Sequence, residues 1–274
     1  MDNTLIRMGL AAAAAATAAS VLAAETNELV EAKASPISAE VTVDFFSSYM
    51  WRGQIYADAP VWQPAATLGL DLGDFGALSA NVWSSFRLTN RREGSPVRNM
   101  GNQEIDYTVS YAKSFGDFDV EAGHIWYTYP NVEDGENTEE LYLSVAYNNP
   151  IVTPSASVYW NYNSAHGEDP SAVYFSFGLA HDFEPIEGLT LTPSASLGFG
   201  DNAWSKYVTG ESAGTELTDQ TIGLAASYAI TENVSVGAQI NYTWIPSHTL
   251  RHLDYMGCGK SQLLWGGVNA TFSF

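Results

Sequence analysis

Apolar and polar residues alternate along many short segments of this chain, and the last segment shows the pattern most clearly. In residues 262–274, Leu264 and Phe272 fall on one side of an extended chain, whereas Asn269 and Thr271 fall on the other. Because successive side chains of a β-strand point to opposite faces, this period of two predicts a strand with one apolar and one small polar face. The segment ends on an aromatic residue, which is typical of a strand that closes a membrane barrel.

About twelve segments repeat this alternation, and each has roughly the length that a tilted strand needs to cross a bilayer. Their polar faces hold mostly Ser, Thr, Asn and Gly, and only 15% of the chain is charged. The strands of a soluble β-sandwich also alternate, but its outer surface would carry many more Lys and Glu residues. The predicted strands cover residues 39–53, 61–72, 77–88, 104–114, 118–129, 138–148, 153–163, 171–183, 189–200, 218–230, 234–245 and 262–274.

The connections between these segments alternate in length, and every short connection follows an even-numbered strand. Bacterial outer-membrane barrels combine an even strand count with short periplasmic turns and long outer loops. We therefore predict an all-β, antiparallel, up-and-down transmembrane β-barrel of about 12 strands over residues 39–274, located in the bacterial outer membrane. The short connections are residues 73–76, 115–117, 149–150, 184–188 and 231–233, and the long ones are residues 53–60, 89–103, 130–137, 164–170, 201–217 and 246–261.

The first 24 residues have the features of a signal peptide. A positive start at Arg7 precedes an Ala-rich apolar run, and small residues at its end offer a cleavage site. A membrane helix is the alternative, but the run is short for a membrane span and Glu25 follows it directly. We predict a signal peptide over residues 1–24 and a periplasmic leader over residues 25–38.

Composition excludes several classes of protein. The chain has 11 Lys and Arg residues against 31 Asp and Glu residues, which argues against nucleic acid as a partner because that binding needs clustered positive charge. The lone cysteine, Cys258, excludes an intramolecular disulfide framework. A membrane barrel would instead contact outer-membrane lipids and lipopolysaccharide, and the sequence leaves its oligomeric state open.

Aromatic residues make up 13% of the chain and fall into two sets. Those near strand ends, including Tyr49, Trp51 and Trp244, are predicted to form an interfacial girdle. A second set lies on the polar faces and would point into the lumen, so we expect a slim or plugged channel. The inward set is Phe46, Trp83, Tyr127, Tyr142 and Tyr174.

Charged residues on the polar faces predict a constriction. Arg52 and Arg87 would point inward near the outer ends of the first and third strands, facing carboxylates on the fourth and sixth strands. Opposed walls of positive and negative charge create a transverse field that orients hydrated solutes. Alternatively, the arginines simply pair with Glu104, Asp106 or Asp44. The candidate constriction residues are Arg52, Arg87, Asp44, Glu104, Asp106 and Glu140.

Two stretches near the start of the barrel resemble a known family. Residues 41–54, VTVDFFSSYMWRGQ, contain Tyr49, Trp51, Arg52 and Gly53, and a Gly-rich turn within residues 68–85 leads into a Trp-containing strand. Together they resemble the TorF-type family of barrels, which are assigned as porins of uncharacterised substrate. The resemblance covers roughly the first third of the chain, and it implies a porin-like role without implying a solute.

Several reactive residues lie in the predicted loops. The last long connection contains four residues whose spacing could bind a metal ion: His248, His252, Asp254 and Cys258. A loop has no helix to align the two histidines, however, so we expect no metal site.

Residues 164–169 hold a Ser, a His and an Asp, yet one loop tip cannot fix the geometry that acyl transfer needs. The acidic run 131–140 could bind Ca²⁺, but its spacing matches no ordered calcium loop and a solvated loop is preferred. We therefore predict that the protein is not an enzyme and needs no cofactor.

The sequence thus favours an outer-membrane porin-like channel for passive diffusion of small hydrophilic solutes. A structural or surface-interaction barrel with a plugged lumen is the alternative, and an outer-membrane hydrolase is a weaker one.

Overall fold

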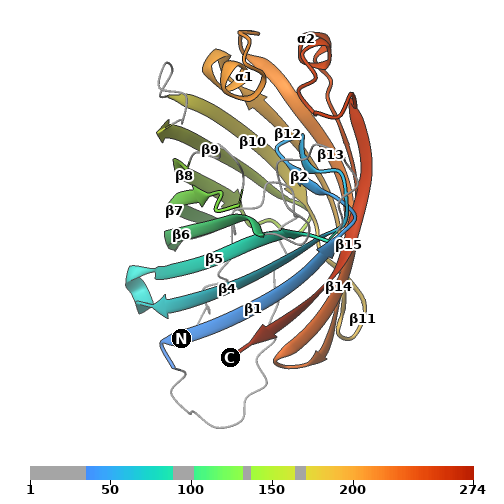
Figure 1. The fold of residues 1–274 in the computed structure, drawn as a ribbon. Coiled ribbons are helices and arrows are strands. Elements are labelled where there is room, and N and C mark those ends of the chain that lie inside the picture. Colours follow the sequence, from blue (N-terminus) through green and yellow to red (C-terminus); the bar gives the residue numbers. More distant parts are fainter. Residues whose placement is uncertain (1–34, 89–101, 132–136, 164–170) are drawn as a thin grey trace.

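The computed structural model describes residues 35–88, 102–131, 137–163 and 171–274. Twelve strands of this part form one closed antiparallel barrel (Figure 1). The predicted signal peptide, most of the predicted leader, residues 164–169 with His166, and half of the acidic run lie outside the described residues. The barrel strands are β1 (Ile37–Phe46), β4 (Val61–Asp71), β5 (Ala77–Arg87), β6 (Asn102–Phe115), β7 (Phe118–Thr128), β8 (Thr138–Tyr147), β9 (Thr153–Asn163), β10 (Ala172–Ala180), β12 (Leu189–Gly200), β13 (Glu216–Thr231), β14 (Val234–Trp244) and β15 (Gln262–Ser273).

The barrel closes where the first strand meets the last. β1 pairs with β15 in an antiparallel register that sets Val43 opposite Ala270, and the backbone nitrogen of Ala39 donates to the carbonyl oxygen of Phe274 at 3.1 Å. Neighbours along the chain pair around the rest of the wall, and β11 (Phe183–Ile186) adds a short pairing to β12 below the end of β10. The predicted all-β barrel is confirmed, and closure leaves no barrel strand with an open edge.

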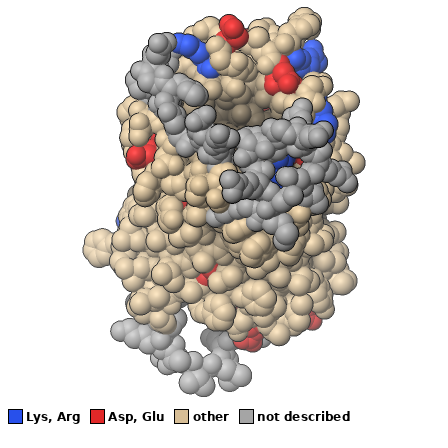
Figure 2. Space-filling view, in the orientation of Figure 1, with Lys and Arg blue, Asp and Glu red and all other residues tan. Residues whose placement is uncertain are grey.

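The two faces of the wall differ in the way that the alternation predicts. On β4, Leu68 points outward and is 61% exposed, whereas its neighbour Thr67 points inward and is 7% exposed. On β6, Val109 is 59% exposed and Thr108 is 4% exposed. Large apolar side chains therefore cover the outside, where Figure 2 shows a wall with few charges below the end that carries most of the visible Lys and Arg. Such a surface suits lipid, because water would leave this apolar area exposed.

The connections alternate in length as predicted, and the long connections that the structure describes in full, residues 47–60, 201–215 and 245–261, leave the wall at one end of the barrel. Helices α1 (Asn202–Thr209) and α2 (His248–His252) lie at that end, opposite the described ends of the chain (Figure 1). The opposite end carries the short turns, one of them with the 3-10 helix η1 (Gly73–Phe75). By the usual arrangement of outer-membrane barrels, the long-connection end is the outer one. No helix in the described part of the chain is long and apolar enough to cross a membrane.

One prediction about the first strand is wrong. β1 ends at Phe46, and residues Tyr49–Trp51 form a separate strand, β2, which pairs with β3 (Gln54–Ala57) in a hairpin within the barrel (Figure 1). All three residues of β2 are buried, so Tyr49 and Trp51 are not part of an interfacial girdle. A strand of the wall needs one lipid-facing side, whereas this run of large side chains is enclosed on both sides.

We expect a charge on the outer face to destabilise the barrel. Val109→Arg places a guanidinium on the outer face midway along β6, which should lower the free energy of unfolding by about 2–4 kcal/mol if the site lies at the bilayer middle. Urea unfolding in lipid vesicles measures this loss, with Val109→Leu as the apolar control. Equal stability of the two variants would show that this face does not contact lipid.

Candidate functional site

The hairpin β2–β3 turns through two residues whose backbone conformation is special. Arg52 has φ +47° and Gly53 has φ +78°, and positive φ at both central residues is what a two-residue type I′ hairpin turn requires. A Cβ atom on Gly53 would lie 2.6 Å from Cβ of Asp219 on β13. Only glycine allows this approach, so the hairpin tip is wedged directly against the barrel wall.

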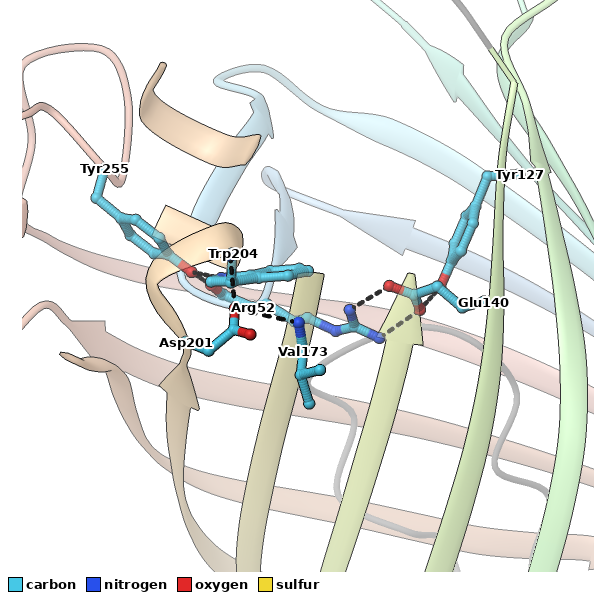
Figure 3. A network of polar contacts seen from close by, with 7 residues as sticks. All are labelled: Arg52, Tyr127, Glu140, Val173, Asp201, Trp204 and Tyr255. Carbon is cyan, nitrogen blue, oxygen red and sulfur yellow. Dashed lines mark hydrogen bonds and ion pairs between the residues drawn. The ribbon is translucent and has the colours of Figure 1, made fainter. Parts of the chain in front are cut away.

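The Arg52 side chain reaches across the lumen from this tip to β8. Its Nη1 and Nη2 atoms donate to Oε1 and Oε2 of Glu140 at 2.7 and 2.8 Å, and the hydroxyl of Tyr127 donates to the same Oε2 at 2.8 Å (Figure 3). Arg52 is 3% exposed and Glu140 is fully buried. A bidentate pair with an added hydrogen bond is the arrangement in which a buried ion pair can offset its cost of desolvation.

Aromatic rings surround the Arg52 guanidinium. Its Cζ atom lies 4.1 Å from the ring centre of Tyr159, 4.3 Å from that of Trp51 and 4.7 Å from that of Tyr174. Burial alone lowers the pKa of Arg52, but the charge of Glu140 and the hydrogen bonds to it raise that pKa by more, so the guanidinium stays charged. The rings add cation–π attraction in a site that excludes water.

The backbone of Arg52 is held by a second chain of contacts. Tyr255 donates its hydroxyl hydrogen to the carbonyl oxygen of Arg52 at 3.0 Å, and Trp204 donates from Nε1 to that hydroxyl oxygen at 2.9 Å (Figure 3). Asp201 caps α1 by accepting from the backbone nitrogen of Trp204 at 2.7 Å and also accepts from that of Val173 at 3.2 Å. Three connections of the barrel therefore meet at Arg52, namely residues 47–60, 201–215 and 245–261.

Further contacts fix these connections to one another. The backbone nitrogen of Ile55 donates to the carbonyl oxygen of Met256 at 2.8 Å, and Lys260 pairs with Asp58 at 2.7 Å with both side chains partly exposed. We call the hairpin with α1 and residues 245–261 the lumen plug. Its hairpin lies within the barrel and its helices lie at the outer end (Figure 1). The predicted inward aromatics are buried in the same cluster as the hairpin, namely Phe46, Trp83, Tyr127, Tyr142 and Tyr174.

The structure brings some of the predicted constriction residues together and separates others. Arg52 pairs with Glu140, one of the candidate constriction carboxylates. The alternative, in which Arg52 pairs with Glu104, Asp106 or Asp44, is therefore wrong for this arginine. Arg52 does not lie on the first wall strand, and from the hairpin tip its side chain reaches β8 instead. The other candidate residues lie on the inner face of the wall: Arg87 at the end of β5, Glu104 and Asp106 on β6, and Asp44 on β1.

Sequence reasoning missed Trp204, Tyr255 and Tyr159 as parts of the site. The inward position of Tyr159 follows from the alternation along β9. Trp204 and Tyr255 lie in long connections, where no periodicity exists to place a side chain. The Asp201 cap before α1 is the one local signal that this connection contains a helix.

The expectation that no helix aligns His248 and His252 is also wrong. Both residues lie on α2, and their Nε2 atoms are 3.1 Å apart. Across the described ranges, no three His, Cys, Asp or Glu side chains are grouped so that they could hold a metal ion.

A comparison with protein families gives a match over most of the chain. Residues 31–251 match the model of a family described as bacterial proteins of unknown function, Gcw_chp. This match does not confirm the TorF-type name. No curated protein sequence matches the chain.

Solved structures of outer-membrane channels and porins are similar to this chain over most of its length. An outer-membrane channel from Pseudomonas putida F1, the COG4313 channel, is 12% identical, with a TM-score of 0.51 over 91% of this chain and 100% of that one. The NanC porin is 12% identical, with a TM-score of 0.48 over 86% of this chain and 98% of that one. The KdgM porin is 11% identical, with a TM-score of 0.47 over 86% and 99%. The likeness to the P. putida channel concerns the fold alone.

Breaking the buried ion pair should cost far more than breaking the exposed one. We expect Glu140→Gln to lower the free energy of unfolding by about 3–5 kcal/mol, because it leaves the buried Arg52 charge uncompensated. Lys260→Met, which removes the exposed pair with Asp58, should cost at most about 1 kcal/mol.

A double-mutant cycle completes this test. Arg52→Met combined with Glu140→Gln should cost less than the sum of the two single changes, because the double variant buries no lone charge. Additive losses in urea titrations would contradict direct coupling between the two side chains.

Proposed function

The chain belongs to the Gcw_chp family of bacterial proteins of unknown function, and we propose that it is a narrow outer-membrane channel for passive diffusion of small hydrophilic solutes. The observation that carries the proposal is a closed barrel whose inner face is polar in the half near the short turns and mixes aromatic with polar side chains in the outer half. Small polar residues such as Ser144, Ser157 and Ser176 line the half of the lumen near the short turns and remain partly exposed. An inner surface of this kind holds water, whereas a barrel that serves only as a scaffold needs no wet interior.

The lumen plug sets the size of solute that we propose can pass. It packs against the inward aromatics of the outer half, so passage depends on the space beside the hairpin or on its displacement. With Arg52 neutralised by Glu140, the proposed constriction consists of Arg87, Glu104 and Asp106 on the adjacent strands β5 and β6. These side chains present both signs of charge to the lumen.

A plugged barrel without transport is the second candidate, and the same ion pair favours it. The three connections joined at Arg52 form a packed aromatic core within the lumen. A barrel filled in this way could act as a rigid platform for the long outer connections. The two candidates differ in whether ions cross the folded protein.

Single-channel recording in planar bilayers separates the two candidates. We expect the folded protein to give small, resolved conductance steps. Replacing residues 48–58, which contain the hairpin, by a short Gly-Ser linker should enlarge the steps, because it removes the tip that reaches the wall.

The complete absence of steps in both proteins would support the plugged barrel. Equal steps in both would show that the hairpin does not limit the channel. Val109→Leu, on the outer face, is the control for effects of substitution on insertion.

A further inference from the structure

The inner face of the barrel has a marked excess of negative charge. With the Arg52–Glu140 pair set aside, the described barrel strands turn only one basic side chain inward, that of Arg87. Lys113, the other basic residue on these strands, follows the outward positions of β6. The inward carboxylates include Glu40, Asp44, Glu104, Asp106, Asp119, Glu121 and Asp219. A lumen lined in this way attracts cations and repels anions.

Asp106 is a buried inward carboxylate that lacks compensating hydrogen bonds within the described residues. It is 1% exposed, and neither of its carboxylate oxygens accepts a hydrogen bond from any residue in the described part of the chain. An ionised carboxylate taken out of water costs several kcal/mol unless a charge or hydrogen bonds compensate it. Glu140 differs, because it receives two bonds from Arg52 and one from Tyr127.

Neutral oxygen atoms lie on the wall next to Asp106. Thr108 is the next inward residue on β6, and Asn81 lies directly opposite Thr108 on β5. Oγ1 of Thr108 and Oδ1 of Asn81 are buried and also accept no hydrogen bond from the described residues. The Nδ2 of Asn81 donates to Thr67 at 2.7 Å, which orients the amide so that its oxygen stays available.

Aromatic side chains flank the same position. Trp83 on β5 and Tyr127 on β7 lie opposite Asp106 in the two neighbouring strands. Trp83 packs on Tyr49 with ring centres 5.4 Å apart, and Tyr127 packs on Trp51 at 5.9 Å, so the hairpin covers this part of the wall. A carboxylate among aromatic rings and neutral oxygens is the chemistry that recognises an organic ammonium group.

We propose that Asp106, with Thr108 and Asn81, forms a binding site for the ammonium group of a cationic solute, and that the channel is selective for cations. This inference rests on the proposed channel function and names the class of solute. The carboxylate supplies the counter-charge, the two neutral oxygens accept N–H hydrogen bonds, and the rings exclude water.

Reversal potentials in a KCl gradient test the selectivity. We expect the wild-type channel to prefer K⁺ over Cl⁻ and Asp106→Asn to reduce that preference several-fold. Glu139→Gln is the matched control, because Glu139 precedes Glu140 on β8 but points outward, where it bonds with His124 and Tyr162. A conducting wild type that prefers Cl⁻, or an Asp106→Asn variant with unchanged selectivity, would overturn the inference and leave the channel function standing.

Block of the current by 1,4-diaminobutane tests the site itself. We expect Asp106→Asn to weaken the block at least tenfold and Asp106→Glu to retain most of it, while the uncharged 1,4-butanediol blocks neither. Equal block of wild type and Asp106→Asn would contradict the assignment.

If the wild type does not conduct, the channel function fails and the site is tested by thermal unfolding. The diamine should raise the Tm of the wild type and not that of Asp106→Asn. A shift with Ca²⁺ but none with the diamine would identify a metal site instead, and no shift with either would show that Asp106 is buried as the neutral acid.

Discussion

A strand that borders lipid must find partners for all of its backbone groups within the protein, and this constraint governs the whole architecture. Lipid offers no hydrogen bonds, so an open sheet edge would leave a row of unsatisfied N–H and C=O groups. The chain meets the constraint by pairing β1 with β15, which closes the sheet around a lumen. Closure then fixes the direction of every side chain on the wall, with apolar residues such as Leu68 and Val109 outside and polar residues inside.

The ion pair between Arg52 and Glu140 organises what lies within that wall. It joins residues that are 88 positions apart in the sequence, from the hairpin tip to β8. The carbonyl oxygen of the same arginine receives the hydrogen bond from Tyr255, which in turn accepts one from Trp204. Two further long connections thus depend on the position of this arginine, and partly exposed polar side chains of the inner face lie toward the short turns.

The sequence predicts the wall well and the lumen plug poorly, for physical reasons. Period-two alternation places every wall strand and the inward carboxylates Glu104 and Asp106. The same alternation runs on through Tyr49 and Trp51, although the chain has left the wall, because a hairpin inside a barrel is also extended. The partner of Arg52 could not be derived, because a hairpin tip can reach several strands and its direction depends on the close approach of Gly53 to β13.

Hydrogen exchange of the lipid-reconstituted barrel tests most directly whether the hairpin is built into the lumen. If residues 49–57 are packed against the wall and joined to the loop at Met256, their amides should exchange as slowly as those of neighbouring wall strands. Exchange at the rate of an exposed loop, with the wall still protected, would contradict the account, because the hairpin would then lie outside the lumen and Arg52 would not reach Glu140.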